Sequence, residues 1–91
     1  EFCLRKKYLQ KIDFSYNELN DLKFVFDQCN NLKLLDLSYN RIQFLTDMFN
    51  EPSKIIILNL DNNFIEKISE DDLKYLNELT ELSLAKNQIN Y

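Results

Sequence analysis

The sequence predicts an α/β solenoid with a parallel β-sheet on its concave face and short helical or irregular segments on its convex face. Three observations support this fold class. One pattern of apolar residues occurs four times, the segments between its copies also repeat their apolar positions, and each period is only 23 or 24 residues long. A unit of that length cannot bury its own apolar face, so successive units must stack on one another.

The repeated pattern is L-x-x-L-x-L-x-x-N-x-L, in which Ile or Phe can replace Leu. Its copies align without gaps at residues 9–19, 32–42, 55–65 and 79–89. All four copies have Asn at the same position of the pattern. Four matches are a strong signal, whereas a match to a single copy could arise by chance. Residues 1–8 are expected to be the end of a preceding repeat, and the segment 1–91 is expected to be part of a longer array.

Each copy is expected to form one short strand at its L-x-L core. Alternation along a strand sends every second side chain to the same face. The side chains expected to point into the core are Ile12, Phe14, Leu35, Leu37, Leu58, Leu60, Leu82 and Leu84. Strands of successive copies would pair in parallel about 4.8 Å apart, and the last strand, at residues 79–84, would be an edge strand.

The segments between the strands carry a second set of recurring apolar residues. These are Leu22, Leu45 and Ile68, then Phe26, Phe49 and Leu73, then Cys29, Pro52 and Leu76. Ser69 followed by three acidic residues is typical of a helix start. Thr46 and Asp47 occupy the equivalent place one repeat earlier. Repeats two and three are therefore each expected to carry a short helix or 3₁₀ turn.

Residues 35–40, with the sequence LDLSYN, resemble the leucine-rich repeat family. The segments that follow each Asn, N-x-L-x-x-L-x-x-x-F-x-x-L, are most similar to the typical subfamily with repeats of 23–24 residues. That subfamily is found in Toll-like receptor ectodomains and secreted innate-immunity proteins. The nearest competitor is the cytoplasmic subfamily with 22-residue repeats. Phe26 and Phe49, at equivalent positions, favour the typical subfamily.

The resemblance implies a leucine-rich repeat solenoid and a structural role for the repeated Asn. In the family this side chain fills the bend after the strand and forms hydrogen bonds with the backbone of adjacent repeats. The ladder expected here consists of Asn17, Asn40, Asn63 and Asn87. Each buried backbone group that lacked such a partner would cost about 1–3 kcal/mol.

The resemblance also implies that a protein ligand or co-receptor binds on the concave face. The alignment gives as candidate contacts Lys11, Asp13, Tyr16, Leu34, Asp36, Tyr39, Arg41, Ile57, Asn59, Phe64, Glu81 and Lys86. Leu34 and Ile57 share a column, and the core pattern requires neither, so we expect an apolar hot spot there. The alternative is that both support sheet pairing. Tyr16 and Tyr39 also share a column, where they could instead shield the Asn turn.

The missing residue types argue against several function classes. The chain contains no His and no Gly, which excludes His-based triads, phosphate-binding Gly loops and Cys₂His₂ zinc sites. We therefore expect no enzyme activity, no cofactor and no metal. The stacked Asp13 and Asp36 could hold a cation, but local hydrogen bonding is their expected role. The net charge of −4 argues against a nucleic-acid partner, and the longest apolar run, 55–58, is too short to insert in a membrane.

Cysteine usage leaves the compartment open. Cys3 and Cys29 are the only cysteines, and the alignment places them about one repeat apart with an offset of three residues. A disulfide between them is possible but not favoured on that alignment. The first hypothesis is an extracellular recognition module of receptor or innate-immunity type. The alternative is a cytoplasmic scaffold or regulatory subunit, which free cysteines and the absence of an N-x-S/T sequon would suit. Oligomers through the solenoid faces or ends are also possible.

Overall fold

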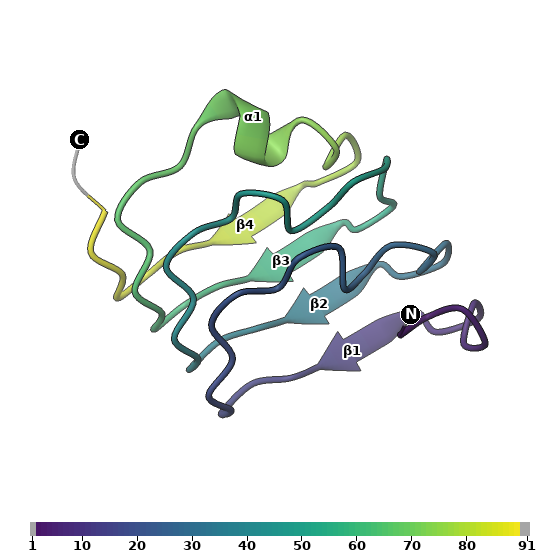
Figure 1. Cartoon of the computed structure of the whole chain (residues 1–91), viewed down its shortest axis with the longest axis horizontal. Coiled ribbons are helices and arrows are strands. Elements are labelled where there is room, and N and C mark those ends of the chain that lie inside the picture. The colour runs from purple at the N-terminus through teal and green to yellow at the C-terminus, as the bar shows by residue number, and fades with distance from the viewer. Residues whose placement is uncertain (1, 90–91) are drawn as a thin grey trace.

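A computed structural model describes residues 2–89 and shows a curved coil of stacked turns (Figure 1). Four strands form one parallel sheet in the order β1-β2-β3-β4, and a short helix, α1, lies across the coil from it. The elements are β1 Lys11–Asp13, β2 Leu34–Asp36, β3 Ile57–Asn59, α1 Glu70–Leu73 and β4 Glu81–Ser83. The expected solenoid fold is confirmed. The expected segment 1–91 also includes residues 1, 90 and 91, which lie outside the described residues.

The strand register follows the sequence period. Ile12 pairs with Leu35, Leu35 with Leu58, and Leu58 with Leu82, so equivalent residues of the repeats lie side by side. These four residues form the inward centre of each strand, and the first three are almost completely buried. The strands are shorter than expected and centre on the first apolar residue of L-x-L. β4 in particular covers only Glu81–Ser83, rather than residues 79–84.

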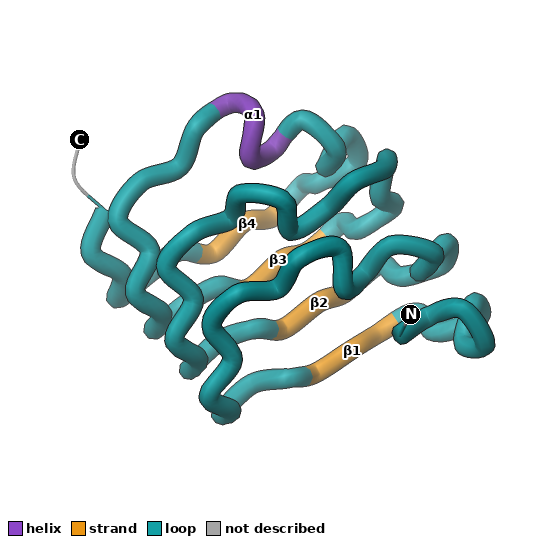
Figure 2. Tube along the Cα trace, in the orientation of Figure 1, coloured by secondary structure: helices purple, strands orange, loops and turns teal. Residues whose placement is uncertain are grey.

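The core lies between the sheet and the loops of the convex side, which make up most of the coil (Figure 2). Leu37 and Leu60 are fully buried, whereas Phe14, Leu82 and Leu84 are only half-buried because they belong to the outer turns. A row of aromatic rings crosses the first turn and continues into the second. Phe14 and Phe26 have ring centroids 6.2 Å apart, and Phe26 and Phe49 are separated by the same distance.

The convex side departs from the expectation in one repeat. α1 forms where predicted, with Ser69 as its N-cap and with the Ser69 backbone N–H donating to the Asp72 carboxylate at 2.9 Å. In repeat two, the described residues form turns instead of the expected helix. Asp47 has a φ of 61°, in the left-handed region, which a continuing right-handed helix does not allow. The third repeat, which carries α1, is one residue longer than the second.

Cys3 and Cys29 form a disulfide, which corrects the expectation from the alignment. An offset of three residues along an extended chain would separate them by about 10 Å. Both residues, however, lie in tight turns, in which Lys6 N–H donates to Cys3 O and Cys29 N–H donates to Phe26 O. These turns bring the two Cα atoms to 5.0 Å across neighbouring coils. The bond joins the segment before β1 to the segment before β2.

The side chains of Asn17, Asn40, Asn63 and Asn87 lie one above another at the bend after each strand. Asn63 is typical: its Oδ1 accepts the Ile42 N–H at 3.0 Å, and its Nδ2 donates to Leu37 O at 2.9 Å and to Leu60 O at 3.1 Å. The amides of Asn40, Asn63 and Asn87 thus each join their own turn to the preceding one. Asn17 is exposed and, among the described residues, bonds only within its own turn.

The difference between Asn63 and Asn17 gives a stability prediction. Asn63→Ala leaves buried amide and carbonyl groups of two turns without partners, so we expect the free energy of unfolding to fall by about 3 kcal/mol or more. Asn17→Ala removes the same atoms from an exposed position and should cost about 1 kcal/mol or less. Urea denaturation followed by circular dichroism measures both. Equal losses would contradict a stabilising role for the bonds between turns.

The disulfide gives a second prediction. Its two cysteines are 26 residues apart in sequence, and closing a loop of that length restricts the unfolded chain. Replacing both with Ala is expected to lower the free energy of unfolding by about 3 kcal/mol. Urea denaturation measures the difference in the free energy of unfolding between the wild-type chain and this variant. That difference should shrink when a reductant is present, because the reductant opens the disulfide of the wild-type chain. If iodoacetamide added mass to the unfolded wild-type chain without reductant, the bond would not be present in the protein as isolated.

Candidate functional site

The outer face of the sheet presents two columns of side chains, because each three-residue strand turns its middle residue inward and its two ends outward. The first column consists of the leading strand residues, Lys11, Leu34, Ile57 and Glu81. The second consists of the final strand residues, Asp13, Asp36, Asn59 and Ser83. Eight of the strand positions are therefore available to a partner on this concave face.

Leu34 and Ile57 form the apolar centre of the first column. They are partners in the β2–β3 register and both are half-buried. They line an open groove of about 250 Å³, here called the strand groove, together with Lys11, Ile12, Leu35, Asp36 and Asn59. A second groove, of about 460 Å³, runs over β3 and β4 and shares Ile57 and Asn59 with the first. Glu81 lies in this second groove.

The carboxylates of the second column are used within the protein. The Oδ1 of Asp13 accepts the backbone N–H of Ser15 at 2.9 Å and its hydroxyl at 2.6 Å, and Asp36 holds Ser38 in the same way. These hydrogen bonds from Ser15 hold the pKa of the Asp13 carboxyl below its usual value, because they stabilise the charged form. Within residues 2–89, no three His, Cys, Asp or Glu side chains are grouped so as to hold a metal ion.

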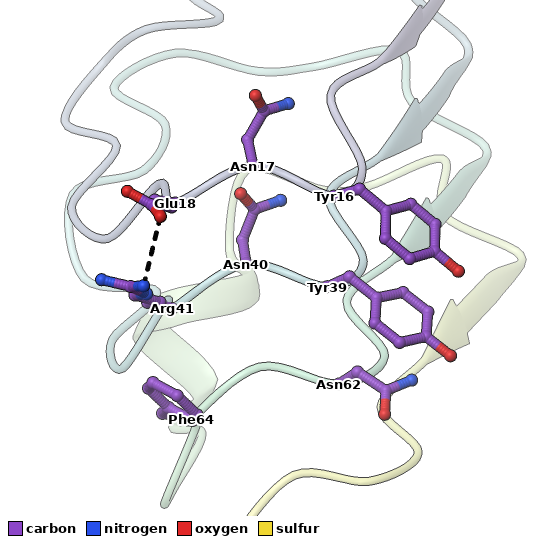
Figure 3. A pocket seen from close by; sticks show the side chains of 8 residues that line it. All are labelled: Tyr16, Asn17, Glu18, Tyr39, Asn40, Arg41, Asn62 and Phe64. Atoms are coloured by element: carbon purple, nitrogen blue, oxygen red, sulfur yellow. Dashed lines mark hydrogen bonds and ion pairs between the residues drawn. The ribbon is translucent and has the colours of Figure 1, made fainter.

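A second candidate surface lies beyond the carboxyl ends of the strands (Figure 3). The Tyr16 and Tyr39 rings stack face to face, with centroids 4.2 Å apart and planes 8° apart. The Tyr39 hydroxyl raises the pKa of Tyr16 above its usual value through hydrogen bonding. Both residues have a positive φ, 58° and 57°, which directs the two rings out of the bend. The stacked pair is exposed to solvent.

The tyrosine pair borders an open pocket of about 450 Å³, here called the turn pocket. Arg41 and Glu18 form an exposed ion pair of 3.3 Å at the other side of the pocket. Phe64 lies beside Arg41 in the next turn and is 42% exposed (Figure 3). The full lining is Tyr16, Asn17, Glu18, Tyr39, Asn40, Arg41, Asn62 and Phe64.

The structure thus divides the sequence-predicted contact residues between two places. The strand groove contains Lys11, Leu34, Asp36, Ile57 and Asn59. The turn pocket contains Tyr16, Tyr39, Arg41 and Phe64. Asp13 borders Asp36 through the β1–β2 register, and Glu81 borders Ile57 through the β3–β4 register. Lys86 is exposed in the turn-four position that corresponds to Tyr16 and Tyr39, and it has the same left-handed backbone, with a φ of 60°.

Sequence reasoning overlooked some exposed apolar residues outside these surfaces. Phe44 and Leu4 are each 52% exposed, and Tyr8 is 76% exposed. The repeat pattern does not require an apolar residue at any of these positions. An apolar residue there could therefore have been recognised from the sequence as an exposed one. Asn62 was also not singled out, although it lies next to Tyr39 in the turn pocket.

In the part of the chain that the structure describes, no helix combines the length and apolar character that crossing a bilayer requires.

Comparison with known proteins identifies the repeats. A family model described as leucine-rich repeat matches residues 44–89, and a second model with the same description matches residues 28–43. No curated protein gives a significant match. The first model alone covers half of the chain, and both lie on the repeats whose strands and bends are described above. The chain therefore belongs to the leucine-rich repeat family, whose domains are protein-binding modules and are generally not enzymes.

Proposed function

We propose that this chain is a protein-recognition module of an extracellular leucine-rich repeat protein, of receptor or innate-immunity type. Its partner, a protein ligand or co-receptor, binds on the concave face. The observation that carries the proposal is the pair Leu34 and Ile57, which lines the strand groove. These positions face away from the core, so packing of the solenoid does not require apolar residues there.

The surroundings of this pair favour a protein as the partner. Hot spots in protein interfaces are apolar centres that a polar rim shields from water. Lys11 and Glu81 stand at the two ends of the same column, and Asp36 and Asn59 stand beside it. The two grooves adjoin at Ile57 and Asn59, so a partner could contact β1 to β4 continuously. The mixed charges of the rim would then select its orientation.

The turn pocket extends this surface beyond the ends of the strands. Tyrosine offers a partner a large apolar ring and a polar hydroxyl at a low cost in side-chain entropy. Stacking further restricts the Tyr16 and Tyr39 rings before any partner arrives. The contact residues proposed for this part are Tyr16, Tyr39, Arg41 and Phe64, with Lys86 further along the same side.

The disulfide supports the extracellular location. Disulfides such as Cys3–Cys29 persist in oxidising compartments and are rare in the cytosol of most organisms. The cytoplasmic scaffold or regulatory subunit, which free cysteines would have suited, is therefore the weaker alternative. The receptor or innate-immunity type follows from the resemblance of residues 35–40 and of the repeat spacing to the typical subfamily.

The test replaces the apolar pair with charge. Leu34→Asp together with Ile57→Asp is expected to abolish capture of a partner from extracellular fluid by the immobilised chain. Once mass spectrometry has identified the captured protein, titration calorimetry with that purified protein should show binding at least about 30-fold weaker for the double variant. That factor corresponds to roughly 2 kcal/mol, the size of one hot spot.

The matched control is Gln43→Asp together with Phe44→Asp. Both residues are exposed, both lie outside the sheet, and the change in net charge is the same. Circular dichroism must first show that all variants are folded. If the groove variant still captured the partner and the control did not, the binding site would include Gln43 and Phe44 instead of the strand groove, and the proposal would be refuted. A partner that binds only the reduced chain would favour the cytoplasmic alternative.

A further inference from the structure

The basic residues of this acidic chain gather on one flank of the solenoid. Five of the 11 lie just before β1, β2 and β3 and a sixth, Lys11, is the first residue of β1, whereas the carboxylates predominate elsewhere. We call these six the basic flank: Arg5, Lys6, Lys7, Lys11, Lys33 and Lys54. The equivalent stretches of the first three turns, 6–12, 29–35 and 52–58, contain no Asp or Glu. The flank lies along the loops on the right in Figure 1.

Stacking of the turns brings these charges close together. Asn31 Nδ2 donates to Lys7 O at 2.7 Å, which joins turns one and two next to Lys7. Lys33 N–H donates to Gln10 O at 2.9 Å, and Lys33 O accepts the Ile56 N–H at 2.8 Å. Lys33 is therefore held between the turn that carries Lys11 and the turn that carries Lys54. Adjacent turns are about 5 Å apart, less than the screening length of about 8 Å at physiological salt.

The charges of the basic flank are not neutralised from within. All six side chains are exposed. Within residues 2–89, the ion pair found is Arg41–Glu18, and it lies at the other end of the strands. Glu51, beside the flank, is engaged by the Gln28 backbone N–H at 2.8 Å. The flank therefore repels itself, and a polyanion that crosses several turns would relieve that repulsion.

We propose that the basic flank binds a linear sulfated polysaccharide. Five of its six charges are lysines, which act as point charges without the paired donors that arginine offers to one phosphate. Their spread over three turns suits a chain of separate anionic groups rather than one small anion. The choice of a sulfated glycan among polyanions rests on the extracellular location proposed above.

The flank is less suited to nucleic acid. Single strands bind to proteins by stacking successive bases on several aromatic side chains. On this flank Tyr8 is exposed, but the stacked Tyr16 and Tyr39 lie at the opposite ends of the strands.

The test measures binding of a heparin-derived octasaccharide to the full chain by calorimetry at several salt concentrations. The flank variant is Lys7→Gln, Lys33→Gln and Lys54→Gln. The matched control is Lys23→Gln, Lys67→Gln and Lys74→Gln. These three lysines are also exposed, lie outside the flank, and change the net charge by the same amount. We expect about 10-fold or greater weakening at physiological salt for the flank variant, with a shallower salt dependence, and little change for the control.

Several results would overturn this proposal. The proposal fails if the wild-type chain does not bind the octasaccharide. It also fails if the affinity for the octasaccharide falls equally in the flank variant and the control variant. Oligodeoxythymidylate or phosphatidylserine vesicles serve as competing anions, and tighter binding of either one would assign the flank to a different class of partner. The flank variant retains Leu34 and Ile57, so loss of glycan binding with intact protein capture separates this surface from the strand groove.

Discussion

The bend after each strand is the constraint on which the rest of the solenoid depends. At each bend one residue adopts a left-handed backbone, with φ between 57° and 60° at Tyr16, Tyr39, Asn62 and Lys86. The chain contains no Gly, so Tyr16, Tyr39 and Lys86 bear the cost of this conformation, which Asn62 adopts more readily. The Asn that follows compensates for it. Its short amide both donates and accepts, so it satisfies backbone groups of two turns at once, as Asn63 does with Leu37 O and the Ile42 N–H.

This hydrogen bonding sets the positions of the functional surfaces. Because the amides of Asn40, Asn63 and Asn87 each fix one turn against the preceding one, equivalent residues come into register and form columns. Leu34 and Ile57 become neighbours although they are far apart in sequence. The left-handed residue of each bend points its side chain outward, so Tyr16 and Tyr39 can stack. The same geometry that closes the core therefore builds the strand groove and the turn pocket.

The repeat pattern predicted the features that recur and failed where a single turn differs. It predicted the order and pairing of the strands and the helix start at Ser69. It did not predict the disulfide, because the positions of Cys3 and Cys29 depend on the tight turns in which they lie rather than on their alignment. It placed a helix in repeat two because Thr46 and Asp47 resemble the start of α1, and the backbone at Asp47 overrides that local preference. Met48, which is almost fully buried, was missed because the position does not recur as apolar: Val25 occupies it in the first repeat, but Asp72 occupies it in the third.

The positions that the repeat leaves free contain the information about partners. Packing of the core requires apolar side chains at Leu35 and Leu58. The residues before and after each of them face outward, where any residue that tolerates a strand would fit. That Leu34 and Ile57 are apolar on consecutive turns, and that Lys33 and Lys54 lie on the adjoining flank without carboxylates, are separate choices of this sequence. An apolar groove and a basic flank recognise different chemistry, and they differ in their response to salt. A single partner that used both would lose affinity with rising salt mainly through its contacts with the flank, because the charges at the rim of the groove are of mixed sign. The salt dependence of binding therefore reports which of the two surfaces a partner uses.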